Sequence, residues 1–101
     1  MVYFNVIIYK LGAADGVAII KSKYDERSKL IERSNYDKNG NLCLDTDGIS
    51  IYKFTYDEKG LETSLTSFGP DKNPKLNNVG FCKYRLCYDE RGNVIERRFS
   101  M

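Results

Sequence analysis

One short phrase holds most of the side chains that could take part in chemistry. YDERGNVIER begins at Tyr88, nearly the same letters open at Tyr24 as YDERSKLIER, and YDEKG begins at Tyr56. Carboxylates gathered from such phrases could bind a hard cation such as calcium, and tyrosine rings could stack on sugars or bases. The three tyrosines are evenly spaced along the chain, however, so the phrase also marks a repeating structure. The aspartates in question are Asp25, Asp57 and Asp89.

The whole chain matches itself at the spacing of these tyrosines. DGVAIIKSKYDER from Asp15, DGISIYKFTYDEK from Asp47 and VGFCKYRLCYDER from Val79 align with their Gly, Tyr, Asp and Glu residues in register. Fixed periods of about 20 to 50 residues are typical of repeat architectures, in which each unit is one supersecondary element. A chain of 101 residues has the size of one domain. We therefore expect a single domain over 1-101, made of a half unit (1-15), repeats 16-47 and 48-79, and a final partial repeat (80-101).

Alternating side chains within each copy predict a strand that ends at the tyrosine. One series of alternate positions is mostly apolar and includes Tyr52 and Tyr84. The positions between them are more polar and carry a cation in every copy, namely Lys21, Lys53 and Arg85. Successive side chains of a strand point to opposite faces, so this period of two indicates half-buried strands with a tyrosine-rich face and a more polar face.

Each tyrosine is followed by a turn. Asp-Glu-Arg/Lys-Gly fits a type I turn with the glycine in the left-handed region, as in a tight hairpin. Ser28 replaces this glycine in the first copy, so its turn should be strained or rearranged. A second turn is expected in YDKNGNL from Tyr36 and in FGPDKNPKL from Phe68. Their DKN letters lie slightly further apart than successive tyrosines do, which predicts a two-residue insertion.

The fold class that follows is all-β. The chain should form an antiparallel meander of about seven strands, built from 32-residue β-hairpin repeats, as a single curved sheet or an open half-barrel. A short amphipathic helix starting near Asp25 is the alternative for the first repeat. The first strand is expected over Val2 to Tyr9, and the returning strands over Leu30 to Tyr36, Leu61 to Phe68 and Val94 to Phe99.

The repeated side chains have a structural interpretation beside the chemical one. Each tyrosine ring can pack on its neighbour, and each aspartate can cap its own turn instead of binding a cation. The repeated cations, with Tyr3, Tyr9, Arg33, Arg97 and Arg98 near them, resemble an RNA-binding sheet or an ordinary solvated face. The candidate interaction face comprises Tyr52, Tyr84, Lys53, Arg85, Tyr24, Tyr56 and Tyr88.

Enzyme chemistry has little support in the composition. The chain has no histidine, which is the usual acid-base group near neutral pH and the commonest metal ligand. No nucleophile-base pair, phosphate loop or metal-ligand spacing is found. We therefore expect no enzyme and assign no catalytic, cofactor-binding or metal-binding residues.

The cysteines and the first residues suggest a cellular location. Cys43, Cys82 and Cys87 cannot all pair within one chain, and Cys82 and Cys87 should lie on opposite faces of one strand, about 16 Å apart. MVYFNVIIYK has no basic start or cleavage site, and it is too short to span a membrane. A cytoplasmic location follows, or a secreted or surface one if the chain is part of a longer protein.

The residues of the repeat also resemble a known family. YDERGNVIE, the strand that ends in Tyr88 and the FGPDKNPKLNNVGF linker resemble the YD-type repeats of bacterial RHS-like proteins and related tandem β-hairpin repeats. The resemblance covers roughly Asp15 to Phe99 and implies a hairpin sheet with a scaffolding or recognition role. It carries over no catalytic residues. Ser28, and Leu61 where the pattern has Asn, depart from it.

The function expected from the sequence is a non-enzymatic β-repeat module that binds protein or acts as a scaffold. It could be a small inhibitor or immunity-type binder, or a fragment of a larger repeat array, and the partner could be a second copy in a homodimer. Carbohydrate or cell-wall binding through the tyrosine-rich face is the alternative, followed by RNA binding. A net charge of +2, with both signs interspersed, argues against nucleic acid and membranes as partners.

Overall fold

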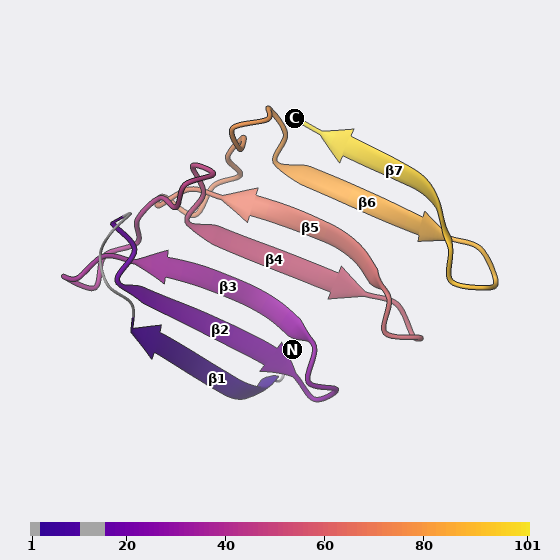
Figure 1. Cartoon of the computed structure of the whole chain (residues 1–101), viewed down its shortest axis with the longest axis horizontal. Helices are drawn as coiled ribbons and strands as arrows, with labels where there is room; N and C mark the ends of the chain where they lie inside the picture. Colours follow the sequence, from indigo (N-terminus) through magenta and orange to yellow (C-terminus); the bar gives the residue numbers. More distant parts are fainter. Residues whose placement is uncertain (1–2, 11–15) are drawn as a thin grey trace.

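The chain forms one antiparallel sheet with its strands in sequence order. The computed structural model describes residues 3–10 and 16–101, and within them every regular element is a strand (Figure 1). The predicted all-β meander is confirmed, and the helix considered from Asp25 is wrong because Leu30–Tyr36 is a strand. The strands are β1 (Tyr3–Lys10), β2 (Ile19–Asp25), β3 (Leu30–Tyr36), β4 (Ile51–Tyr56), β5 (Glu62–Phe68), β6 (Lys83–Tyr88) and β7 (Val94–Ser100).

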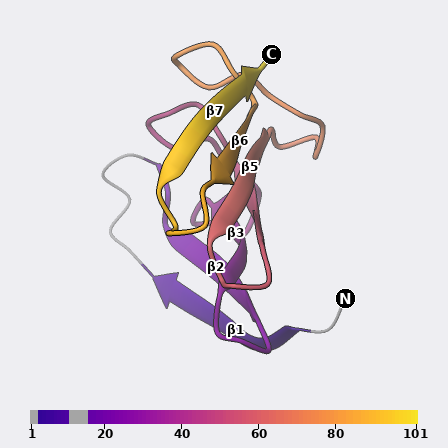
Figure 2. The ribbon, with the colours of Figure 1, turned by 90° about the vertical axis from the view of Figure 1, so that its right-hand side faces the viewer.

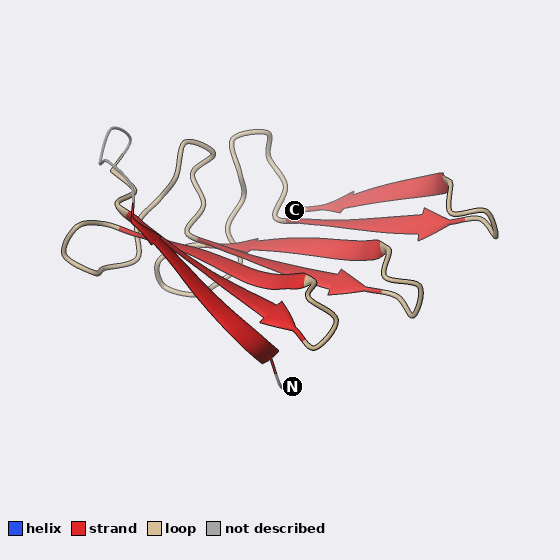
Figure 3. Cartoon of the chain, turned by 60° about the horizontal axis from the view of Figure 1, so that its bottom comes forward, coloured by secondary structure: helices blue, strands red, loops and turns tan. Residues whose placement is uncertain are grey.

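Three hairpins, β2–β3, β4–β5 and β6–β7, are joined by shorter ladders. Within a hairpin the pairing runs nearly the whole strand, with a bulge next to the turn. Between hairpins only Glu32–Ser34 of β3 pair with β4, and Ser64–Thr66 of β5 pair with β6. The hairpin tips consequently diverge on one side of the sheet (Figure 1), while longer loops lie at the other side (Figure 3). Viewed from its side, the sheet twists from β1 to β7 (Figure 2).

The hairpin turns share one geometry, including the copy that lacks glycine. Gly60 and Gly92 both have φ of 85°, and Ser28 has φ of 62°. The Ser28 amide donates to the Asp25 carbonyl at 3.0 Å, as the Gly60 amide does to Asp57. The first turn is therefore not rearranged, and Ser28 occupies the left-handed region that disfavours a side chain.

The loop turns show that the predicted two-residue insertion is wrong. The Gly40 amide donates to the Asp37 carbonyl, and the Lys72 amide donates to the Gly69 carbonyl, each at 3.0 Å. These turns are one full repeat apart, so Lys72 (φ 68°) stands where the previous repeat has Gly40 (φ 83°). The turn hydrogen bonds therefore keep the same spacing as the repeat. The second DKN motif lies two positions later in its turn than the first one does.

The core is small and lies near the loop ends of the strands. Its buried apolar residues, among those described, are Val17, Ala18, Ile49 and Ile51. Ile51 is on the same face as Lys53 but is only 7% exposed, and it pairs with Ser34 on one side and Phe68 on the other. The backbone amides of Asn35, Ser50 and Ser67 donate to neighbouring strand segments across the sheet. Several buried positions are polar: these are Ser22, Ser34, Asn35, Ser50 and Ser67.

The strained turn yields a matched pair of variants. Ser28→Gly should raise the free energy of unfolding by about 1 kcal/mol because it relieves the left-handed side chain. Gly92→Ser should lower it by a similar amount, since a Cβ there meets only Leu61 at an ordinary 3.8 Å and the cost is conformational. Urea unfolding followed by circular dichroism measures both. Equal stability of the two variants would contradict this account of the turns.

Candidate interaction surface

The sheet has two faces that differ in character. We call the tyrosine face the one that carries alternate residues of β2, β4 and β6 ending at the tyrosine, and the cation face the other one. Directly paired residues share a face, so the pairing assigns the returning strands as well. The tyrosine face includes Tyr24, Tyr52, Phe54, Tyr56, Tyr84, Leu86 and Tyr88, and the cation face includes Lys21, Lys53 and Arg85.

The repeated aspartates shape their own turns. Asp25 accepts the amides of Arg27 and Lys29 through one carboxylate oxygen, both at 2.9 Å. Asp57 and Asp89 accept the amides two and four positions further on at the same distance. Among the described residues no group of three or more His, Cys, Asp or Glu side chains could hold a metal ion. The bonds to the turn amides confirm that these aspartates cap their own turns.

The tyrosine that ends each outgoing strand is bonded to the preceding hairpin. The Tyr56 hydroxyl donates to the Leu30 carbonyl at 2.7 Å, and the Tyr88 hydroxyl donates to the Glu62 carbonyl at 2.5 Å. Leu30 and Glu62 are the first residues of β3 and β5, where the hairpins diverge. Burial, and after it the Glu62 carboxylate, raises the pKa of both tyrosines. These hydroxyls therefore join neighbouring hairpins where the backbone ladder is missing.

Two other tyrosines of the candidate face donate to carboxylates. The Tyr52 hydroxyl bonds Asp45 and the Tyr84 hydroxyl bonds Glu62, each at 2.5 Å. Burial, followed by the bond to the carboxylate, raises the pKa of both phenols. The hydroxyls of Tyr52, Tyr56, Tyr84 and Tyr88 are thus all engaged within the protein.

Asp45 is a central residue that sequence reasoning missed. Its carboxylate accepts the amides of Asp47 and Ile49, the Asn35 side chain at 3.4 Å and the Tyr52 hydroxyl. It therefore connects a loop turn to two strands. A sequence signal was present, because Asp45 precedes Gly48 by the same spacing that places Asp57 before Gly60.

An aromatic cluster lies at the last hairpin. The rings of Phe81 and Phe99 are 4.8 Å apart between centroids, and Tyr84 makes edge contacts with both. Phe99 is nonetheless 59% exposed. The hollow beside the cluster is lined by residues that include Tyr52, Leu65, Val79, Phe81 and Tyr84. Apolar surface and engaged hydroxyls make this part of the tyrosine face suited to protein contacts.

The cations do not gather on one face. Lys53 and Arg85 are exposed on the cation face, where the Lys53 ammonium lies 5.0 Å from the Phe68 ring centre. Arg33, expected near them, instead lies on the tyrosine face 6.0 Å from the Tyr52 ring centre. Arg97 pairs with Leu86 on that same face. Arg98 pairs with Arg85 on the cation face, where it was expected. The side chains of Tyr3 and Tyr9 lie outside the described residues.

The cysteines fall within the described part of the chain, and none of them forms a disulfide. Cys87 is exposed on β6 and points to Glu96 of β7, with its sulfur 3.8 Å from the carboxylate. Cys82 precedes β6 and is partly buried.

Comparison with known proteins does not assign the chain to a family. No family model matches the chain, and neither the curated proteins nor the solved structures contain a significant match. None of the described residues belongs to a helix long and apolar enough to cross a membrane.

The hydroxyl bonds between hairpins can be removed one at a time. Tyr56→Phe and Tyr88→Phe should each lower the free energy of unfolding by about 1 kcal/mol, since each deletes one hydrogen bond and keeps the ring. Hydrogen exchange should speed up most at the amides that join hairpins, Asn35 for the first variant and Ser67 for the second. Uniform exchange changes across the sheet would contradict the joining role.

The raised pKa values predict late ionisation in alkaline solution. Tyr52, Tyr56, Tyr84 and Tyr88 should ionise above the ordinary value of about 10 in an ultraviolet titration of the eight tyrosines. Because their pKa is higher in the folded than in the unfolded state, their stabilisation is complete below pH 10 and is lost as the pH rises through the folded value. Tyr84→Phe should remove one late-ionising group. A single transition near pH 10 for all eight tyrosines would contradict the predicted late ionisation.

Proposed function

We propose that this chain is a non-enzymatic β-repeat module that binds proteins and serves as an interaction scaffold. The observation that carries the proposal is the exposure of the last hairpin. All seven residues of β7 are exposed, and so is the apolar surface of Phe99 beside Phe81 and Tyr84. Large apolar patches on a soluble protein commonly mark sites of protein contact.

The single-layer architecture supports the proposal. The molecule measures 46 × 32 × 22 Å, and its core contains four buried apolar residues among those described. No second layer covers either face of the described sheet, so a partner would supply the missing cover. Exposed apolar residues gather toward the last hairpin, where they include Val79, Ile95, Phe99 and Met101.

Carbohydrate binding is the alternative use of the tyrosine face. Sugar recognition needs aromatic rings together with polar groups that bond to sugar hydroxyls. The hydroxyls of Tyr52, Tyr56, Tyr84 and Tyr88 already donate to protein acceptors, which leaves the rings alone for stacking. The engaged hydroxyls therefore favour a protein partner. A change in tyrosine fluorescence on adding soluble glycans would support the alternative instead.

Self-association offers a direct test with a matched control. We expect light scattering from about 1 to about 100 µM to show a concentration-dependent increase in mass, with a second copy as one partner. Phe99→Ser should weaken the association by about thirtyfold, as the loss of a central aromatic contact does. Ile8→Ser removes an apolar side chain that is equally exposed (59%) on β1 and should have little effect. A mass of one chain throughout, with no crosslinking of a photoreactive residue at position 99 to any protein, would contradict the proposal.

A further inference from the structure

The last strand repeats the sequence of a strand that is already occupied. Ile31-Glu32-Arg33 of β3 recurs as Ile95-Glu96-Arg97 of β7. In β3 the open edge of this segment is filled by β4, which pairs at Ile51, Tyr52 and Lys53. Among the described strands, none pairs with the equivalent edge of β7, which is the last in the strand order of the sheet.

The contacts between β3 and β4 show what fills such an edge. Lys53 lies opposite Glu32, and the Arg33 guanidinium lies 6.0 Å from the centre of the Tyr52 ring. The Tyr56 hydroxyl reaches the Leu30 carbonyl at 2.7 Å. The incoming strand thus offers a tyrosine, a cation next to it and a second tyrosine four positions after the first.

Backbone N–H and C=O groups of β7 point to its open edge, as the equivalent groups of β3 and β5 point to the next hairpin. The Asn35 amide donates to the Ser50 carbonyl just before β4, and the Ser67 amide donates to the Cys82 carbonyl just before β6. Phe99 is the next member of this series, one further repeat along the chain. Ser100 accepts from the Cys82 amide and so points toward β6. Since backbone groups alternate in direction, those of Phe99 and Arg97 point outward.

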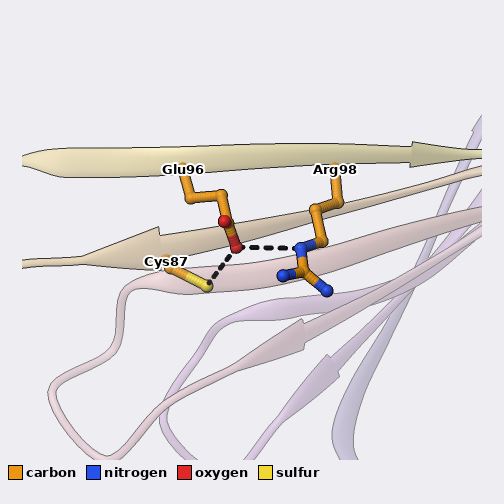
Figure 4. Close-up of polar contacts among 3 residues, drawn as sticks. All are labelled: Cys87, Glu96 and Arg98. Carbon is orange, nitrogen blue, oxygen red and sulfur yellow. Dashed lines mark hydrogen bonds and ion pairs between the residues drawn. The ribbon is translucent and has the colours of Figure 1, made fainter.

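The side chains that would meet an incoming strand are exposed. One carboxylate oxygen of Glu96 contacts both the Arg98 guanidinium and the Cys87 sulfur (Figure 4). The distances are 2.9 Å to the Arg98 nitrogen and 3.8 Å to the sulfur. The Arg98 and Glu96 side chains are 72% and 46% exposed, so their ion pair is weak and can be shared with a further cation. Glu96 therefore has the register position that Glu32 has opposite Lys53. Glu32 itself forms its ion pair with Lys23 of β2, at 3.2 Å, as Glu96 does with Arg98.

We propose that β7 is a docking edge for an extended segment of another polypeptide that has the pattern of β4. The segment would lie antiparallel to β7, with an aromatic residue opposite Arg97 and a cation opposite Glu96. Its second tyrosine would donate to the Val94 carbonyl, which is the counterpart of the Leu30 and Glu62 carbonyls. This addition of a strand to a sheet edge combines backbone bonds with side-chain selection. The inference rests on the proposed protein-binding function and names the partner's chemistry.

Arg98 makes the edge selective among strands of this kind. Its counterparts in β3 and β5 are Ser34 and Thr66, which pair with Ile51 and Lys83. A residue like Lys83 opposite Arg98 would place two like charges together, which is unfavourable in a cross-strand pair. A strand of the β4 type, with isoleucine at that position, should therefore bind better than one of the β6 type.

A labelled peptide tests the docking edge. The probe is ISIYKFTYD, which has the sequence of residues 49–57, titrated with the full chain and followed by fluorescence anisotropy. We expect saturable binding, and binding about fivefold weaker for FCKYRLCYD, the sequence of residues 81–89. Charge exchange checks the register: Glu96→Lys in the protein or Lys53→Glu in the peptide should each weaken binding about two- to fivefold, and the two together should restore it.

A backbone variant separates edge pairing from other contacts. Arg97→Pro removes an outward amide and leaves the β6–β7 ladder bonds, so peptide binding should fall about tenfold while the folded spectrum is kept. Arg97→Ala keeps the amide and serves as the control, with a smaller loss from the missing guanidinium.

The outcomes distinguish this inference from the function on which it rests. Absent peptide binding, or peptide binding that Arg97→Pro leaves unchanged, overturns the docking edge. If Phe99-dependent association persists in that case, the protein-binding function stands. A different result is that Arg97→Pro abolishes self-association while the peptide does not compete with it. This result would identify pairing of β7 with β7 of a second copy, and it would also overturn the proposed partner.

Discussion

A one-layer sheet must obtain its order from contacts within the layer, and in this protein the weak points are the junctions between hairpins. The two strands of each hairpin are paired along most of their length. Neighbouring hairpins are joined only by the strand pairs at Glu32–Ser34 or Ser64–Thr66. The Tyr56 and Tyr88 hydroxyls add one bond at each junction, where the strands diverge. These bonds matter because the apolar core is too small to hold the hairpins together by burial.

This constraint explains why the tyrosine and the aspartate stay together in the repeated phrase. Asp57 fixes the turn of its own hairpin, while the adjacent Tyr56 reaches the hairpin before it. The phrase therefore sets both the local geometry and the distance to the neighbour. The same division of roles applies to Tyr88 and Asp89 in the last hairpin. The aspartates look suited to cation chemistry in the sequence, but one oxygen of each carboxylate accepts two backbone amides of its own turn.

Much of the fold could be predicted because its signals are local. The turn residues located the hairpins, and the expected strand from Leu30 to Tyr36 coincides with β3. Contacts that depend on register were not predictable in the same way. The two DKN motifs suggested a two-residue insertion. The hydrogen bond from the Lys72 amide to the Gly69 carbonyl shows that the turn has no such insertion. The partners of Tyr52 and Tyr84 were also missed, since an acceptor on a loop or on a neighbouring hairpin leaves no periodic trace. Arg33 was placed on the wrong face because the bulge next to the β2–β3 turn, which sets its pairing with Ser22, has no clear sequence signal.

The repeat also gives the open end of the sheet a specific character. β7 carries the same Ile-Glu-Arg segment that β3 uses to hold β4, and it presents that segment to solvent. The most direct measurement is hydrogen exchange of the β7 amides with and without the β4-type peptide. The account predicts that Glu96, Arg98 and Ser100 are protected in the protein alone, and that Arg97 and Phe99 become protected only when the peptide is added. Unchanged exchange at Arg97 and Phe99, or new protection confined to β1, would contradict it.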